Sequence, residues 1–162
     1  MVAFFFSFLF FQLTLSQGSW TELSSSPPLT ARCCTPGMYN SVSNSMFIFG
    51  GASDPLGISV YGDFWEYFIS NNSWIKLTPN SLPSARYFHS GIYVSSSNSL
   101  LIFGGSTGSG NTVLNDLWEY SISNNTWTQL TPPNPIPSVR YSHSAIYIPP
   151  SFKIHLKTNP AI

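Results

Sequence analysis

Short apolar runs alternate with segments rich in Gly, Ser, Asn and Pro along most of the chain. Residues 90–94, 99–103 and 127–130 are three such runs, each too short for a typical helix. In residues 116–122, Trp118, Tyr120 and Ile122 alternate with the residues between them, which is the period of a half-buried strand. These four segments predict one four-stranded sheet. No sustained 3.6-residue periodicity occurs outside the extreme N-terminus, so we predict an all-β protein.

The same pattern returns at a nearly constant interval. The arginines Arg32, Arg86 and Arg140 are spaced by 54 residues, and the diglycine at 50–51 returns 54 residues later at 104–105. A fixed period near 50 residues with diglycine and aromatic landmarks is typical of the blades of a β-propeller. The recurring landmarks are Arg32, Arg86, Arg140, Gly50, Gly51, Gly104, Gly105, Trp65, Trp118, Trp74 and Trp127.

These motifs resemble the kelch repeat, a family that includes the central domain of galactose oxidase. The resemblance rests on Arg-x-x-His, Ile-Phe-Gly-Gly, Asn-Asp-Leu-Trp-x-Tyr and a final Trp, and it covers residues 20–148. It implies a kelch-type β-propeller fragment with two complete four-stranded blades, at residues 31–78 and 85–131. Partial blades would flank them: a closing strand at about 20–30 and the start of a further blade at 139–148, within a kelch region of 18–148.

Each recurring residue type has a physical reason to recur. Glycines at 104–105 permit a sharp turn or a close approach of two backbones, which a Cβ would block. Tryptophans provide large faces on which neighbouring sheets pack. Arg86, Asp116 and Glu119 also recur in the repeat, and buried charges need partners. We therefore expect the repeated charges to form structural pairs between strands or blades.

Residues 1–17 differ in composition from the rest of the chain. They form a short Phe-rich apolar run without Lys or Arg, followed by small polar residues. This pattern predicts a secretory signal peptide cleaved near Ser16 or Gln17, and hence a secreted or extracellular protein. The alternative is an uncleaved N-terminal anchor that tethers the protein to a membrane, although the run is short for a span.

Two glycosylation sequons occupy the same turn of consecutive repeats. They begin at Asn71 and Asn124 and read Asn-Asn-Ser and Asn-Asn-Thr. The structural explanation is a turn in which Asn adopts the left-handed conformation that hairpins need. With a signal peptide, both residues are candidates for glycan attachment.

Cys33 and Cys34 are the only cysteines. Adjacent cysteines can form a disulfide only with strain in the peptide between them. They stand where Tyr87 and Phe88 stand one repeat later, so we interpret them as small apolar residues or as an intermolecular pair. A redox site is disfavoured because no base lies nearby in the sequence.

The repeat stops after Ile148, and residues 149–162 form a divergent tail. In this tail Phe152, Ile154 and Leu156 alternate with basic residues, so a strand is possible. The tail could take the place of the second strand of a third blade. It could instead be sequence foreign to the repeat.

Composition excludes several classes of function. Charged residues make up 7% of the chain and the net charge is zero, so no basic surface for nucleic acid is expected. His89 and His143 occupy one repeat position, which favours a structural hydrogen bond over metal ligation. The glycine-rich segment 104–110 lacks a following Lys and helix, so we interpret it as a flexible loop. No catalytic residue, metal site or cofactor is predicted.

The pattern favours a secreted kelch scaffold that binds an unknown protein or a glycan and has no catalytic activity. Loops at 52–62 and 106–115 are the expected contact surface, since binding loops sit on rigid scaffolds. An alternative is a truncated fragment of a larger propeller without independent function, because two blades cannot close a ring of four to eight. Open blade edges would then invite self-association. An enzyme on the propeller is the third hypothesis.

Overall fold

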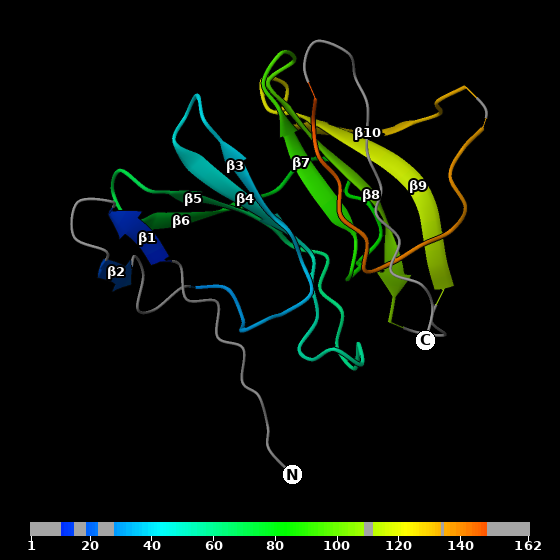
Figure 1. Cartoon of the computed structure of the whole chain (residues 1–162), viewed down its shortest axis with the longest axis horizontal. Coiled ribbons are helices and arrows are strands. Elements are labelled where there is room, and N and C mark those ends of the chain that lie inside the picture. Colours follow the sequence, from blue (N-terminus) through cyan, green and yellow to red (C-terminus); the bar gives the residue numbers. More distant parts are fainter. Residues whose placement is uncertain (1–10, 15–18, 23–27, 109–111, 134, 149–162) are drawn as a thin grey trace.

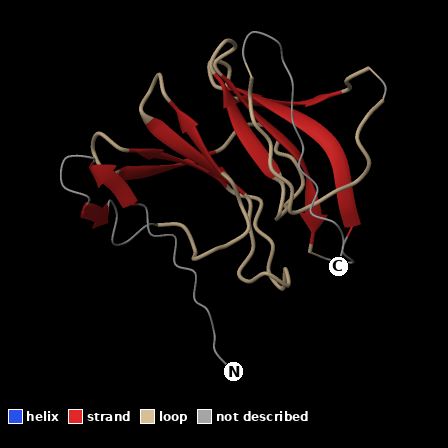
Figure 2. Cartoon of the chain, in the orientation of Figure 1, coloured by secondary structure: helices blue, strands red, loops and turns tan. Residues whose placement is uncertain are grey.

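The computed structural model describes the chain apart from residues 1–10, 15–18, 23–27, 109–111, 134 and 149–162. Its strands form two four-stranded antiparallel sheets and one two-stranded hairpin (Figure 1). The described residues contain no helix, and hence none that could cross a membrane (Figure 2). The predicted all-β class is confirmed, and the two sheets do not close into a ring.

Each four-stranded sheet is one repeat, with its strands hydrogen-bonded in sequence order. The first sheet, blade 1, lies within predicted residues 31–78 and the second, blade 2, within 85–131. Consecutive antiparallel strands joined by short turns need no crossover, which is why the order in space follows the order in the chain. The strands are β3 (Gly37–Asn40), β4 (Ser45–Phe49), β5 (Phe64–Phe68) and β6 (Ser73–Leu77), then β7 (Ser90–Val94), β8 (Ser99–Thr107), β9 (Thr112–Ser121) and β10 (Thr126–Leu130).

Strands β8 and β9 are longer than the sequence pattern predicts. The pairing continues beyond Phe103 after a register shift, with Gly105 opposite Leu114 and Thr107 opposite Thr112. The prediction of a flexible loop over 104–110 is therefore wrong for its first four residues. A β-bulge absorbs the diglycine and lets the ladder resume beyond it, so Gly104 and Gly105 bend the strand without ending it.

A separate hairpin precedes the blades. Strand β1 (Phe11–Thr14) pairs antiparallel with β2 (Ser19–Glu22), and neither strand joins a four-stranded sheet. Closure of a blade by residues 20–30 therefore stays a prediction. Most of the predicted signal peptide and the whole of tail 149–162 lie outside the described residues, so cleavage and the tail strand also stay predictions.

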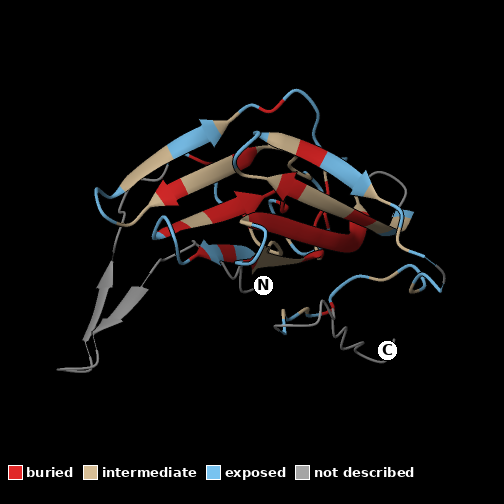
Figure 3. Cartoon of the chain, turned by 90° about the horizontal axis from the view of Figure 1, so that it is seen from above, coloured by how far each residue is buried: buried red, intermediate tan, exposed pale blue. Residues whose placement is uncertain are grey.

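The main core lies between the two blades. Blade 1 contributes Phe47, Phe49 and Phe64 to it, and blade 2 contributes Leu100, Ile102, Tyr120 and Trp127. The Phe64 ring lies 4.7 Å from Tyr120 and 5.3 Å from Trp127, in edge-to-face geometry. Buried residues are concentrated in β4 and β8, whereas the outer strands β6 and β10 consist mostly of exposed or partly buried residues (Figure 3). The core belongs to the contact between repeats, so neither sheet has a complete core of its own.

Every blade has two different faces because side chains alternate along its strands. We call the face towards the preceding repeat the N-side face and the face towards the following repeat the C-side face. Leu100 and Ile102 lie on the N-side face of blade 2, whereas Leu101 and Phe103 lie on its C-side face. The latter pack with Tyr147, from the beginning of the third repeat.

Candidate protein-binding face

The recurring arginines link the segment before the first strand of each blade to its third strand. Arg86 is fully buried and binds both carboxylate oxygens of Asp116, with N–O distances of 2.7 and 2.8 Å. It also donates to the Gly104 carbonyl oxygen at 3.1 Å, and Trp118 Nε1 donates to Asp116 at 2.7 Å. Burial raises the pKa of Asp116, but the hydrogen bonds and charge of Arg86 outweigh burial and leave that pKa below its usual value.

Blade 1 repeats this arrangement. Arg32 is also buried and donates to Asp63 Oδ2 at 2.9 Å and to the Gly50 carbonyl oxygen at 2.9 Å. Trp65 Nε1 donates to the same carboxylate at 2.7 Å. Both ion pairs therefore connect residues of a single blade. Glu66 forms no such pair among the described residues: its carboxylate accepts a hydrogen bond from Ser45.

Arg140 of the third repeat has only part of this environment. Its Nε donates to the Ser138 carbonyl oxygen at 3.0 Å and its Nη2 to Ser138 Oγ at 3.2 Å, as Arg86 does to Ser84. Among the described residues, no carboxylate pairs with Arg140. The third repeat therefore has the same arginine–serine hydrogen bonds as the second, although the rest of its blade lies outside the described residues.

The diglycines connect one repeat to the next. Gly51 N donates to the Arg86 carbonyl oxygen and Gly105 N to that of Arg140, both at 2.9 Å. A Cβ on Gly50 would lie 2.5 Å from the Arg86 oxygen, and Gly50 has a φ of +70°. Only glycine permits this approach without strain. The landmark Gly50 and its repeat Gly104 therefore allow successive repeats to dock.

The two histidines differ in their hydrogen bonding. His143 Nε2 lies 2.9 Å from Ser90 Oγ, within hydrogen-bond distance. His89 is buried, and neither ring nitrogen has a hydrogen-bond partner among the residues that the structure describes. The expected structural hydrogen bond is therefore wrong for His89, whose ring packs edge-on against Phe49 at 5.9 Å. Burial, with a smaller contribution from Arg86, lowers the pKa of His89 to about 3, so the ring is neutral near pH 7.

Cys33 and Cys34 are free thiols in the structure. Cys34 has a left-handed conformation with a φ of +66°. Phe88 and Ser142, at the same position of the next two repeats, are left-handed too. Burial is the main factor that raises the pKa of Cys34 to about 12, with Cys33 adding to it. Such a thiol stays protonated near neutral pH, which disfavours thiolate chemistry.

The loop between β4 and β5 is held in a defined conformation by its own polar groups. Asp54 Oδ1 accepts hydrogen bonds from the backbone N–H groups of Leu56 at 2.8 Å and Ile58 at 3.5 Å. Ser53 and Ser59 close the base of the loop through a 2.9 Å backbone hydrogen bond. Leu56 and Ile58 are thereby presented with 80% and 79% of their surface exposed.

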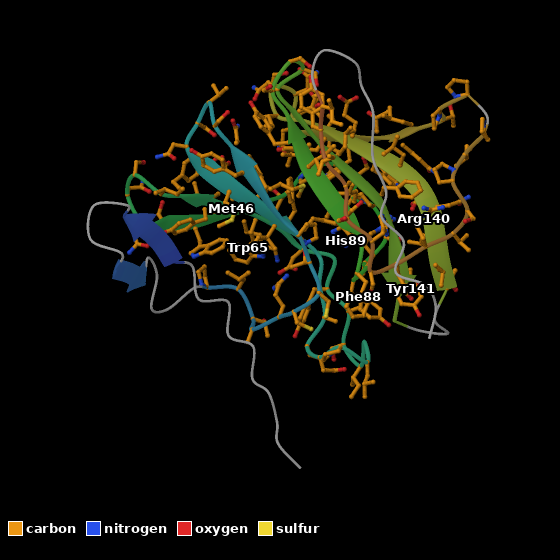
Figure 4. All side chains as sticks on the ribbon, in the orientation of Figure 1. Met46, Trp65, Phe88, His89, Arg140 and Tyr141 are labelled. Carbon is orange, nitrogen blue, oxygen red and sulfur yellow. The ribbon has the colours of Figure 1, made fainter. Side chains whose placement is uncertain are left out.

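Two grooves lie beside these side chains. One, of about 360 Å³, is bordered by Leu56 and has aromatic walls from Tyr87, Phe88 and Tyr141. Phe88 stacks obliquely on Tyr87 at 4.9 Å and lies 6.1 Å from Tyr141 (labelled with Phe88 in Figure 4). The other, of about 540 Å³, runs between Ile58 and the β8–β9 hairpin at Thr107 and Gly108. The two loops predicted as the contact surface therefore border two grooves, one with aromatic walls and one lined by Ile58 and Val60.

The sequon residues lie at the opposite ends of the strands. Asn71 is in the β5–β6 turn and Asn124 in the β9–β10 turn, and both are exposed. The next residue in each turn, Asn72 or Asn125, has a positive φ of 54° or 50°. The left-handed Asn expected for the turn is therefore the second Asn of each sequon, and Asn71 and Asn124 remain candidates for glycosylation.

Sequence reasoning missed a recurring contact in these turns. A Tyr hydroxyl donates to the side-chain oxygen of the left-handed Asn five residues later, at 2.6 to 3.0 Å. The signal was present as a Tyr-x4-Asn spacing that occurs in the first and last hairpins of both blades. The pairs are Tyr39–Asn44, Tyr67–Asn72, Tyr93–Asn98 and Tyr120–Asn125.

Comparison with known proteins places this architecture in a family. Residues 6–154 match the KLHDC2/KLHL20/DRC7 Kelch-repeats domain. The human multiple epidermal growth factor-like domains protein 8 is 30% identical over 118 residues, which are 72% of this chain and 4% of that protein. The Rho GTPase-activating protein gacHH of Dictyostelium discoideum is 34% identical over 90 residues, 54% of this chain and 6% of that protein.

A third relative, Mei4-dependent protein 6 of Schizosaccharomyces pombe, is 28% identical over 100 residues, 58% of this chain and 14% of that protein. The chain thus spans at most 14% of the length of these three relatives. Kelch repeats mediate protein–protein interactions and are generally non-catalytic scaffolds. With its two diglycine-linked, arginine-anchored blades and a match over nearly its whole length, the chain belongs to the kelch-repeat family.

Proposed function

We propose that this kelch-repeat chain is a non-catalytic scaffold that binds a protein through the loop face at 52–62 and 106–115. The observation that carries the proposal is the pair Leu56 and Ile58, two large apolar side chains held out from the protein by a loop with its own hydrogen bonds. Exposed apolar groups next to a groove are typical of interaction sites. A rigid loop binds with less loss of entropy than a flexible one.

The chemistry of the grooves indicates the type of partner. The smaller groove has aromatic walls from Tyr87, Phe88 and Tyr141. The larger groove has an aliphatic wall that includes Val60. Asp54 is the only charged residue of the sequence 52–62, and its carboxylate accepts hydrogen bonds from Ser53 and Leu56 within the loop. An apolar segment of a protein partner fits these walls best. Aromatic faces also stack on sugars, so a glycan is the second candidate ligand.

The same proposal places the protein outside the cell. It rests on the predicted signal peptide at 1–17 and on the exposure of Asn71 and Asn124 at turns remote from the loop face. Glycans there would leave the grooves accessible. The alternative, an uncleaved N-terminal membrane anchor, would present the same face. The N-terminal residue and the mass change on glycosidase treatment, measured on protein from a secretory host, test these points.

The loop face is tested by selection from a displayed-peptide library on the purified chain. Peptides that bind are then measured against the double variant Leu56→Ser/Ile58→Ser. We expect at least about tenfold weaker binding, since each 1.4 kcal/mol of lost contact corresponds to about tenfold. Val42→Ser is the matched control, because Val42 is 74% exposed in the β3–β4 turn at the other end of blade 1. No binders, or binders that tolerate the double variant, would refute the proposal.

Self-association through open blade edges belongs to the same proposal, because the two sheets do not form a closed ring. The alternative of a propeller fragment without independent function predicts neither selective peptide binding nor a defined assembly. The described residues contain no group of three or more His, Cys, Asp or Glu side chains that could hold a metal ion.

A further inference from the structure

The smaller of the two grooves has walls of a distinct composition. Tyr87, Phe88 and Tyr141 line it, and the Phe88 ring lies 4.9 Å from that of Tyr87 and 6.1 Å from that of Tyr141. The rings come from two successive repeats, and Phe88 and Tyr141 are labelled next to each other in Figure 4. Aromatic rings in contact give the groove a broad apolar wall on which other flat or cyclic groups can pack.

The backbone around this groove is already paired. Tyr87 and Ser106 exchange two backbone hydrogen bonds, of 3.0 and 2.9 Å, and Ser106 also lies opposite Val113 in the β8–β9 ladder. In the loop between β4 and β5, the N–H of Leu56 donates to the Asp54 carboxylate at 2.8 Å. An extended ligand would therefore find no free strand edge among these wall residues with which to form a ladder.

Walls of this kind favour a ligand without backbone N–H groups. A peptide N–H that is buried without a partner costs free energy comparable to a lost hydrogen bond. Proline has no N–H, so a proline-rich segment can be buried against these walls without that cost. Such a segment is already extended in the polyproline II conformation, which has no internal hydrogen bonds, so little entropy is lost on binding. Polyproline II segments characteristically dock in grooves lined by aromatic rings.

Tyr141 also offers a polar group to the carbonyl oxygens of such a segment. Tyr141 is 55% exposed, and its hydroxyl has no hydrogen-bond partner among the described residues. In this it differs from the tyrosines of the hairpin turns, such as Tyr93 and Tyr120, whose hydroxyls donate to Asn side chains. The Tyr141 hydroxyl is therefore free to donate to a ligand carbonyl oxygen while its ring packs on a proline.

Asp54 adds a negative charge beside the groove. The residues that line the groove are uncharged, and Asp54 immediately precedes the loop residues among them. Hydrogen bonds, above all that from Ser53, hold the pKa of Asp54 below its usual value, so the carboxylate is ionised at neutral pH. Arg140 is also close in sequence, but its guanidinium donates to Ser138. A basic residue next to the prolines would be attracted to Asp54, whereas an acidic residue would be repelled.

We propose that the partner bound at the loop face presents a proline-rich segment in the polyproline II conformation, which lies in the groove walled by Tyr87, Phe88 and Tyr141 with a basic residue beside Asp54. This inference rests on the proposed function, because it names the kind of protein segment that the loop face receives. It also adds Tyr141, which lies outside both loops, to the residues that determine specificity.

Fluorescence polarisation with labelled peptides on the full chain is the experiment. The first peptide is an oligoproline flanked by arginines, and the second has the same length and flanks but alanine at every other position. We expect the first to bind at least about tenfold more tightly, because each alanine restores an N–H and removes a ring. A third peptide, with glutamate in place of the arginines, should bind up to about fivefold more weakly than the first, since surface ion pairs contribute little. Equal binding of the first two peptides would overturn the proposal.

Substitution of Tyr141 tests the groove itself. Tyr141→Ala should weaken binding of the oligoproline at least about tenfold, because it removes one aromatic wall. Tyr141→Phe should lose less affinity, since it keeps the ring and removes only the hydroxyl donor. Tyr39→Ala is the matched control: Tyr39 is 50% exposed on β3 and does not line the groove, so binding should be unchanged. Thermal unfolding verifies that each variant folds, and unchanged binding to folded Tyr141→Ala would overturn the proposal.

Selection from the displayed-peptide library separates this inference from the proposed function. The selected peptides should be enriched in proline and should bind more weakly both to Tyr141→Ala and to Leu56→Ser/Ile58→Ser. Peptides that depend on Leu56 and Ile58 but contain no proline would overturn the inference and leave the proposed function standing. The same holds for proline-rich peptides that bind Tyr141→Ala as tightly as the unmodified chain. A selection that yields no binders would overturn both.

Discussion

At the scale of single residues, some buried polar groups have hydrogen-bond partners and others, such as the His89 ring, have none among the described residues. Arg86 is fully buried, but Asp116 and the Gly104 carbonyl oxygen accept its hydrogen bonds. Truncation of one partner in such a pair typically costs about 3–5 kcal/mol, because the other charge stays buried alone. His89 is also buried, yet neither of its ring nitrogens has a partner in the described part of the chain. This ring departs from the rule that buried polar groups are paired.

Replacement of His89 with Phe should remove a pH dependence of stability. A histidine in the unfolded chain titrates near 6.5, whereas burial lowers the pKa of His89 to about 3 in the folded protein. Below pH 6.5 the unfolded chain gains a proton that the folded protein does not. The free energy of unfolding therefore decreases by up to about 1.4 kcal/mol for each unit by which the pH is lowered. His89→Phe should lessen this slope and keep or increase stability near pH 7, since an apolar ring needs no partner.

Urea unfolding of both proteins between about pH 7 and about pH 5 measures the effect. The titration of Asp63 and Asp116 does not contribute to the slope in this pH range. Their folded pKa values are lowered, so the stability they contribute is present above about pH 4 and is lost only as the pH falls further. An unchanged slope above about pH 5 in His89→Phe would contradict the assignment to His89.

At the scale of strands and turns, glycine and asparagine positions determine where the chain can bend. The hairpin turns place Asn in the left-handed conformation and fasten it with a Tyr hydroxyl. The diglycines have a different role, because both bring a backbone from the next repeat into contact and the second, at 104–105, also interrupts the register of β8. Both features can be recognised from a few neighbouring residues in the sequence. The contact made by the diglycine, however, also needs a chain segment about 35 residues away, as for Gly105 and Arg140.

Gly104→Ala should destabilise the protein by more than about 1–2 kcal/mol, the cost of a left-handed conformation for a residue with a Cβ. Gly104 has a φ of +62°, and its Cβ would lie 2.7 Å from the Arg140 carbonyl oxygen, which cannot move without opening the contact between repeats. The free energy of unfolding in urea is the measurement.

Gly37→Ala is the control for that substitution. Its Cβ would meet only the sulfur of Met46, at 3.0 Å, and that side chain is flexible. We expect a change well below that of Gly104→Ala. Equal effects for the two glycines would show that neither the left-handed conformation of Gly104 nor its close approach to Arg140 explains the loss of stability.

At the scale of the whole molecule, the two blades depend on a shared core. Phe47, Phe49 and Phe64 of blade 1 pack on Tyr120 and Trp127 of blade 2. The contact between repeats thus contains the aromatic cluster, and each sheet alone would expose one of its apolar faces. Stability in such arrays comes from the sum of repeats and their interfaces.

Phe64→Ala should therefore cost about 3–5 kcal/mol and loosen both blades together. Its ring contacts Phe47 and Phe49 within blade 1 and Tyr120 and Trp127 across the interface. Urea unfolding followed by Trp fluorescence should show one transition at lower urea. Phe68→Ala on the same strand is the control, since Phe68 is only partly buried and lies outside this cluster, and it should cost less.

Much of the fold could be predicted because its signals are local. The alternation at 116–122, the turn residues and the 54-residue spacing of Arg32, Arg86 and Arg140 predict strands, turns and repeats without any knowledge of contacts. The loops at 52–62 could be proposed as a contact surface on the same grounds. The extension of β8 and β9 through Gly104 could not, because a bulge and a loop have the same sequence signal until the partner strand is known.

The sequence by itself therefore determined the repeat, the strand order and the residue types at each landmark, since periodicity and turn chemistry act over a few residues. Only the tertiary structure decided which faces meet, that His89 has no hydrogen-bond partner among the described residues, and that Leu56 borders an aromatic groove. These features arise where side chains from different repeats come together. Their geometry depends on how two sheets pack, and no spacing within one repeat encodes that distance.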